Sequence, residues 1–165
     1  MKKNGLEKER REMEDKYEIK IIPYSSKRWY KNGLFHREDG PAIEHYDGTK
    51  FWYKNGKRHR EDGPAVEYAD GTKEWYKYGK LHRENGPAAE YSHGNKFWYH
   101  NGMRHRDDGP AAEYSHGEKS YYLEGLQYKE EDYYKYMKEI DDLPIELQLT
   151  HEKEWVRDRA KKSSK

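Results

Sequence analysis

The chain of 165 residues contains no cysteine, only three phenylalanines and no apolar run long enough to span a membrane. Without cysteine there is neither a disulfide framework nor a thiolate metal site. Without a long apolar run or a signal-peptide core, we expect no membrane span and a soluble, cytoplasmic protein. The 39% charged and 32% apolar residues approach the composition of disordered chains. The 15% aromatic content instead predicts a fold held by aromatic side chains rather than by a thick aliphatic core.

A strong net charge of one sign is also absent, since 33 Lys and Arg face 32 Asp and Glu. Residues 153–165 form a basic tail with six Lys or Arg and two acids, which leaves residues 17–152 acidic by four charges. We therefore do not expect a phosphate-binding surface on the body of the chain, although the tail could contact phosphate or an acidic protein.

What the sequence has in abundance is repetition. Trp29, Trp52, Trp75 and Trp98 recur with a 23-residue period, and Tyr121 takes the next position. The segments that begin at the tryptophans read WYKNGLFHREDGPA, WYKNGKRHREDGPA, WYKYGKLHRENGPA and WYHNGMRHRDDGPA. A period of 20–50 residues indicates an array of similar supersecondary units rather than one globular core. We expect four repeats and a degenerate fifth over residues 24–128.

Each repeat has two hairpin signals, such as Asp70-Gly71 and Tyr78-Gly79, and then a proline that interrupts pairing. Two-residue turns would place Val66 opposite Trp75, and Trp75 opposite His82. This register predicts a Trp–His–aliphatic row on one face of a sheet. The other face would carry a row of tyrosines with Glu and Arg beside it.

The ends of the array differ from the repeats. Residues 5–16 are helix formers, and 17–22 alternate as a strand, so we expect residues 1–23 to form an N-terminal helix and capping strand. Tyr133, Tyr136, Met137 and Ile140 form an apolar stripe at helical spacing, which predicts a helix that begins near Glu130. Residues 129–165 are expected to form a C-terminal helical cap and the basic tail, with 143–150 ambiguous between strand and helix.

The segments NGKRH at 55–59 and YADGTKEW at 68–75 resemble the MORN repeat, which has the same period. The chain departs from that pattern where RxDGP follows the histidine, and it is closer to a MORN-like variant similar to repeats in bacteriophage and giant-virus proteins. The resemblance covers about residues 28–135. It implies a mainly β fold: an elongated single-layer antiparallel β-meander of 23-residue repeats with helical N- and C-terminal caps. MORN-type arrays serve as scaffolds for protein interaction, dimerisation or lipid binding.

The histidines of the repeats suggest metal or acid–base chemistry. In the predicted register each lies opposite a tryptophan and three strands, roughly 14 Å, from the next, which is too far for shared coordination. The HRxDGPA box has no nucleophile or phosphate loop beside it, so we interpret it as a turn whose Arg pairs with Glu44, Glu67, Glu90 or Glu113. We expect no enzyme activity, no catalytic residue, no metal and no cofactor. The structural repeat core is predicted to consist of Trp29, Trp52, Trp75, Trp98, His36, His59, His82 and His105.

Positions that vary inside a fixed repeat are candidates for partner contact, with drift as the equal alternative. Exposed Phe and Leu at such positions would form a patch typical of a protein interface. On the predicted tyrosine face the candidates are Phe35, Arg58, Leu81, Arg104, Phe51, Glu74, Phe97, Tyr53, Tyr76 and Tyr99.

The leading hypothesis is a non-enzymatic repeat scaffold that binds a macromolecule, most readily a protein. The viral resemblance implies a host protein in the host cytoplasm, such as a defence complex that the chain inhibits by occlusion or mimicry, as an anti-CRISPR does. One alternative is an RNA- or nucleotide-binding module that uses the aromatic and Arg rows with the basic tail. Another is a self-associating structural protein. The sequence leaves open the partner, the exposed sheet face and the oligomeric state.

Overall fold

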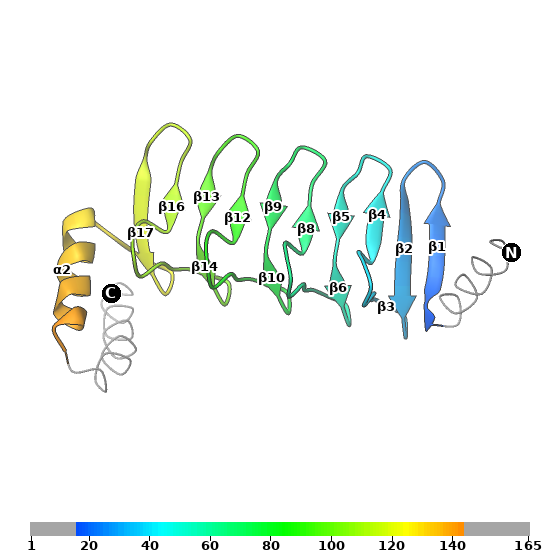
Figure 1. Ribbon diagram of the computed structural model, residues 1–165, viewed down its shortest axis with the longest axis horizontal. Coiled ribbons are helices and arrows are strands. Elements are labelled where there is room, and N and C mark those ends of the chain that lie inside the picture. Colours follow the sequence, from blue (N-terminus) through cyan, green and yellow to red (C-terminus); the bar gives the residue numbers. More distant parts are fainter. Residues whose placement is uncertain (1–15, 144–165) are drawn as a thin grey trace, which may run out of the picture. The chain divides into compact units, whose positions relative to one another are not determined.

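The computed structural model describes residues 16–143 (Figure 1). The chain falls into two compact units divided between Leu81 and His82. Each unit is mainly β and antiparallel, with its strands in meander order, and a helix follows the last strand. The predicted fold class is thus confirmed. The expected helix at 5–16, the segment 144–150 and the basic tail lie outside the described residues. No helix within residues 16–143 is long and apolar enough to cross a membrane.

The first unit contains an antiparallel sheet whose strands pair in the order of the chain. These strands are β1 (Glu18–Ile22), β2 (Ser26–Lys31), β4 (Ile43–His45), β5 (Lys50–Phe51), β8 (Val66–Glu67) and β9 (Lys73–Glu74). Short hairpin strands alternate with them in the chain: β3 (Leu34–Phe35) on β2, β6 (Tyr53–Lys54) with β7 (Lys57–Arg58), and β10 (Tyr76–Lys77) with β11 (Lys80–Leu81).

The second unit repeats this pattern and ends in the helix. Its sheet strands are β12 (Ala89–Glu90), β13 (Lys96–Phe97), β16 (Ala112–Glu113), β17 (Lys119–Leu123) and β18 (Leu126–Tyr128). The hairpin β14 (Tyr99–His100) with β15 (Met103–Arg104) lies between β13 and β16 in the chain, and helix α2 spans Glu130–Asp141. Strands β5, β9 and β13 begin at residues 50, 73 and 96, so the secondary structure recurs with the 23-residue period.

The Asn-Gly turns form two-residue hairpins, as predicted. Asn55 and Gly56 both have positive φ, 51° and 75°, and the flanking strands pair Tyr53 with Arg58. Positive φ at both central residues defines the type I′ turn, whose twist matches that of the strands. Tyr78 adopts the same conformation, with φ of 50°, although its sister positions have asparagine.

The Asp-Gly turns differ from the prediction by one residue. Strands β8 and β9 pair Val66 with Glu74 rather than with Trp75. In the loop between them only Gly71 has positive φ (90°), whereas a two-residue type I′ turn would also require it at Asp70. The loop therefore has three residues and a left-handed glycine. The Asp70 carboxylate accepts the N–H of Thr72 at 2.8 Å and favours this turn, and the equivalent loop with His93 in place of the aspartate has the same length.

The shift of one residue moves the aliphatic side chains to the opposite face from the predicted one, because side chains alternate along a strand. Val66 and Ile43 lie opposite Phe51, on the face of the tyrosines. The N–H of Trp52 donates to the carbonyl of Ala65 at 2.8 Å, so the tryptophan face carries alanine instead. The predicted Trp–His–aliphatic row is in fact a Trp–His–Ala row.

The core is thin, and its composition follows from this alternation. Ala42, Ala65 and Val66 are fully buried in the first unit, and Trp29 is almost so. In the second unit a larger apolar cluster forms where helix α2 covers the last hairpin. The predicted apolar stripe makes this contact, because Tyr133, Tyr136 and Ile140 are buried there and Met137 packs against them. The cluster consists of Tyr121, Leu123, Tyr128, Tyr133, Tyr136 and Ile140.

Candidate interaction surfaces

The arginine of each HRxDG loop organises that loop. The Arg60 guanidinium stacks over the ring of Trp52, with 4.1 Å from Cζ to the ring centroid. Its Nε donates to Asp62 at 2.9 Å, and one terminal nitrogen donates to Glu67 at 3.0 Å. The same nitrogen lies 3.3 Å from the carbonyl oxygen of Pro64. The Arg60 bond holds the pKa of Asp62 below its usual value.

The other loops repeat this arrangement. Arg37 and Arg106 lie over Trp29 and Trp98 at 4.1 and 4.2 Å. The predicted pairing of each arginine with a glutamate further along its repeat is confirmed. The pairs are Arg37–Glu44, Arg60–Glu67, Arg83–Glu90 and Arg106–Glu113, at 2.8 to 3.1 Å.

The repeat histidines join each loop to the next hairpin turn. His82 Nδ1 accepts the backbone N–H of Asn101 at 3.1 Å, and its Nε2 lies 2.8 Å from Glu84. His105 likewise accepts the N–H of Glu124 at 3.1 Å. Because the Nδ1 atom of His82 accepts an N–H, Nε2 is the protonated nitrogen in its neutral ring. His36, His59 and His82 are buried and His105 is half-buried.

The predicted core tryptophans differ in exposure. Trp29 is 1% exposed, whereas Trp52, Trp75 and Trp98 are only half-buried. One face of each tryptophan whose contacts are given above is covered by its own arginine rather than by a second layer of protein. The half-buried rings of Trp52 and Trp98 therefore lie near the surface of the molecule.

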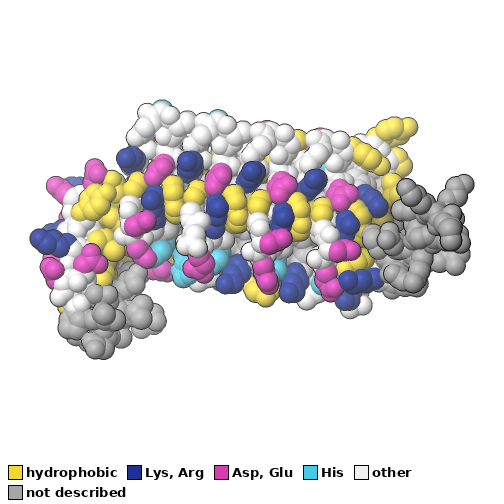
Figure 2. Space-filling model, viewed as in Figure 1, with side chains coloured by type: hydrophobic (Ala, Val, Ile, Leu, Met, Phe, Trp, Pro, Cys, Tyr) yellow, Lys and Arg dark blue, Asp and Glu magenta, His cyan; other side chains and the backbone are white. Residues whose placement is uncertain are grey.

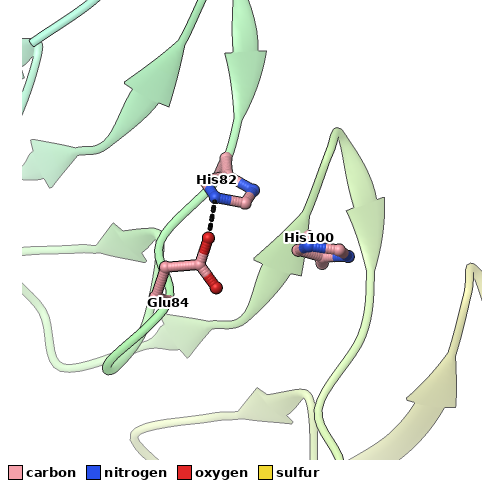
Figure 3. Close-up of side chains that lie close together, drawn as sticks. All are labelled: His82, Glu84 and His100. Carbon is pink, nitrogen blue, oxygen red and sulfur yellow. Dashed lines mark hydrogen bonds and ion pairs between the residues drawn. The ribbon is translucent and has the colours of Figure 1, made fainter. Parts of the chain in front are cut away.

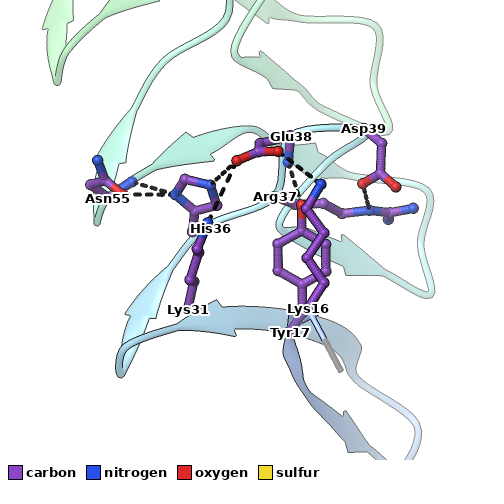
Figure 4. A network of polar contacts seen from close by, with 8 residues as sticks. All are labelled: Lys16, Tyr17, Lys31, His36, Arg37, Glu38, Asp39 and Asn55. Atoms are coloured by element: carbon purple, nitrogen blue, oxygen red, sulfur yellow. Dashed lines mark hydrogen bonds and ion pairs between the residues drawn. The ribbon is translucent and has the colours of Figure 1, made fainter. Parts of the chain in front are cut away.

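At the N-terminal end, a network of polar contacts joins the first loop to the start of β1 (Figure 4). The buried Tyr17 hydroxyl accepts the N–H of Glu38 at 3.1 Å, and Lys16 forms an ion pair with the Glu38 carboxylate at 2.8 Å. Lys16, with His36 as a second donor, lowers the pKa of Glu38 to about 2. In the last repeat the hydroxyl of Tyr133 performs the same role, since it accepts the N–H of Gly109 at 3.0 Å.

Grooves lie between successive HRxDG loops. In the first unit a groove of about 690 Å³ is lined by Trp52, Lys54 and other residues of the first two loops. In the second unit a groove of about 330 Å³ is lined at the equivalent positions, with Trp98 and His100 in those two places. Figure 2 shows charged side chains of both signs alternating beside a line of hydrophobic side chains over the strands.

In both grooves the negatively charged side chains are more exposed to solvent than the arginines. The arginines are 14 to 29% exposed and bind their own carboxylates. The acids on the rims are each half or more exposed, up to 83% for Asp62. The exposed charge of the rims is therefore mainly negative, with the exposed Lys54 as a cation in the first groove. These acids are Glu38, Asp39, Glu61 and Asp62 in the first unit and Glu84, Asp107 and Asp108 in the second.

In each unit the predicted partner-binding residues belong to a row of packed aromatic and arginine side chains, which we call the tyrosine row of that unit. Phe35 stacks on Tyr30 at 4.7 Å, and the Arg58 guanidinium lies 5.2 Å from the centre of the Tyr76 ring. Arg58 is also 3.8 Å from Glu74. The Phe and Leu side chains at these positions are half-buried or buried. Glu74 and Phe97 are buried, and the half-buried members are Phe35, Phe51, Tyr53, Arg58, Tyr76, Leu81, Tyr99 and Arg104.

The sequence did not lead to two features of these surfaces, the grooves and His100. The grooves were missed because they depend on contacts between the loops of successive repeats. His100 was missed although a signal was present: it replaces the lysine of the sister repeats at positions 31, 54 and 77.

No family model matches the chain, and no curated protein matches its sequence.

Proposed function

We propose that the chain is a non-enzymatic, MORN-like repeat scaffold whose HRxDG grooves bind a protein partner. The observation that carries the proposal is that the acidic side chains around the grooves are more exposed to solvent than the arginines. The Arg60 and Arg106 guanidiniums are only 22% and 21% exposed and are engaged with carboxylates of their own repeat, whereas the rim carboxylates that they bind, Asp62 and Asp108, remain 83% and 82% exposed. A partner segment with Lys or Arg side chains would complement these rims, and half-exposed tryptophans offer it apolar contact.

The same contacts disfavour the RNA-binding alternative. Base stacking requires a free aromatic face, and the arginines over Trp29, Trp52 and Trp98 already occupy one. Phosphate binding requires unpaired cations, and the loop arginines are paired with acids. The exposed rim acids would in addition repel a phosphate backbone.

The proposed partner is a protein of the cell in which the chain acts, and a host defence complex is the target that the viral resemblance implies. The test is purification of the tagged chain from those cells, with and without nuclease, together with light scattering of the pure protein. We expect a protein that is retained after nuclease treatment. Co-purified RNA whose binding falls steeply with salt would contradict the proposal, and so would ordered oligomers without any partner.

A further inference from the structure

The second unit contains a cluster of metal-binding side chains that has no counterpart at the equivalent place in the first. His100 stands where the other repeats have lysine, at the end of β14 next to its hairpin turn. Its side chain lies beside those of His82 and Glu84 (Figure 3), and its ring centre is 5.0 Å from that of His82. The ring centre of His105 is 5.7 Å from that of His100. A lysine ammonium at this position would repel a cation, whereas a neutral imidazole can bind one.

We propose that His82, Glu84 and His100 bind a divalent transition-metal ion, with Zn²⁺ as the best fit. One ligand atom from each of the three side chains lies within 4.8 Å of the others, so small rotations bring them around one ion. Two imidazoles and one carboxylate form a ligand set that Zn²⁺ binds tetrahedrally, with the fourth position open. A set without thiolate or thioether disfavours Cu(I), and two imidazoles disfavour Mg²⁺ and Ca²⁺.

The surroundings provide access and an outer shell. The groove of about 330 Å³ is lined by Glu84 and His100, so an ion and the water that completes its coordination can enter from solvent. His105 and Asp107 line the same groove, and His105 Nε2 lies 2.7 Å from Asp107. This pair can hold a water bound to the ion, as outer-shell carboxylates and imidazoles do in metal sites.

Binding changes one hydrogen bond in a way that can be observed. Because His82 Nδ1 accepts the N–H of Asn101, its Nε2 carries the proton and donates to Glu84. An ion on Nε2 requires the proton to move to Nδ1, and the N–H of Asn101 then loses its acceptor. The Glu84 oxygen loses its hydrogen bond from His82 and coordinates the ion instead. The backbone amide of Asn101 therefore reports metal binding at this site specifically.

The test uses the full chain without a histidine tag, titrated with Zn²⁺ by calorimetry and with Co²⁺ by visible absorption. We expect one strong site with tetrahedral Co²⁺ absorption, a shifted Asn101 amide resonance, and faster exchange of that amide. His100→Lys should weaken binding at least tenfold. This variant should fold normally without metal, because lysine is the residue at this place in three sister repeats.

A gain of binding provides the matched control. Lys54 is the position equivalent to His100 in the first unit, where His36 and Glu38 correspond to His82 and Glu84. Lys54→His should add a second Zn²⁺ site and leave the first unchanged. Equal Zn²⁺ affinity of the wild type and His100→Lys would overturn the proposal, since other histidines would then be the ligands. Absence of tetrahedral Co²⁺ absorption in the wild type would overturn it as well.

Discussion

The arginine of the HRxDG loop contacts an aromatic ring, two carboxylates and a backbone carbonyl at the same time. One guanidinium covers a tryptophan, bonds an aspartate and a glutamate, and binds a backbone carbonyl in its own loop. The planar fork of nitrogens makes these bonds in several directions at once, which a lysine ammonium does less well. The loop conformation, and with it the wall of each groove, depends on this side chain.

Arg60→Lys should lower the free energy of unfolding by about 1–3 kcal/mol, because the stacking over Trp52 and part of the hydrogen bonding are lost. Urea unfolding measures the change as a lower midpoint at an unchanged slope. Lys73→Arg, at an exposed position of β9, is the control and should leave the midpoint unchanged. An Arg60→Lys variant as stable as the wild type would contradict this role of the arginine.

The buried Tyr133 hydroxyl should make the stability of the fold depend on pH in the alkaline range. Burial raises its pKa to about 12, and the nearby Asp107 and Asp108 carboxylates act in the same direction. The folded chain therefore holds the proton more tightly than the unfolded chain. The resulting stability is fully present below the unfolded pKa of about 10 and is lost as pH rises toward 12. Tyr133→Phe should be less stable at neutral pH and should lose less stability over this range, as measured by urea unfolding at several pH values.

At the scale of elements, local sequence signals predicted one of the two turns of each repeat correctly and the other with the wrong loop length. The Asn-Gly hairpins and the start of helix α2 at Glu130 follow from turn chemistry and apolar spacing, and both were predictable. The Asp-Gly register was not, because two-residue and three-residue loops share this dipeptide. The Asp70 bond to the N–H of Thr72 supports the three-residue loop, but the same loop forms where His93 replaces the aspartate.

The three-residue loop makes a prediction about Gly71. Its φ is 90°, and an added Cβ would meet no atom within 4 Å, so the cost of a side chain is backbone strain alone. Gly71→Ala should destabilise the chain by about 1 kcal/mol. Gly71→Asn should cost less, because asparagine tolerates positive φ. Equal thermal stability of all three proteins would indicate a different turn.

At the scale of the whole molecule, repeated segments build the sheet and the grooves, and departures from the repeat add chemistry. The Arg–Glu pairs could be predicted because both partners lie close together in one repeat. The grooves and the His82–His100 contact could not, since they arise between repeats and depend on how far neighbouring loops lie apart. In each unit the predicted partner residues belong to a packed row whose members are half-buried or buried.

The groove proposal is tested most directly by neutralising the rim without disturbing its hydrogen bonds. The rim variant carries Glu38→Gln, Asp39→Asn, Glu61→Gln and Asp62→Asn. Each new amide keeps an oxygen that can accept a hydrogen bond. A control variant carries Glu18→Gln and Glu118→Gln, at exposed acids that do not line the grooves described above. Unfolding curves first establish that both variants are folded.

The decisive measurement is the affinity of the partner protein for these variants, by calorimetry at fixed salt. The groove proposal predicts at least tenfold weaker binding to the rim variant and unchanged binding to the control variant. Equal affinity of the wild type and a folded rim variant would contradict it, and the partner site would then lie elsewhere on the chain.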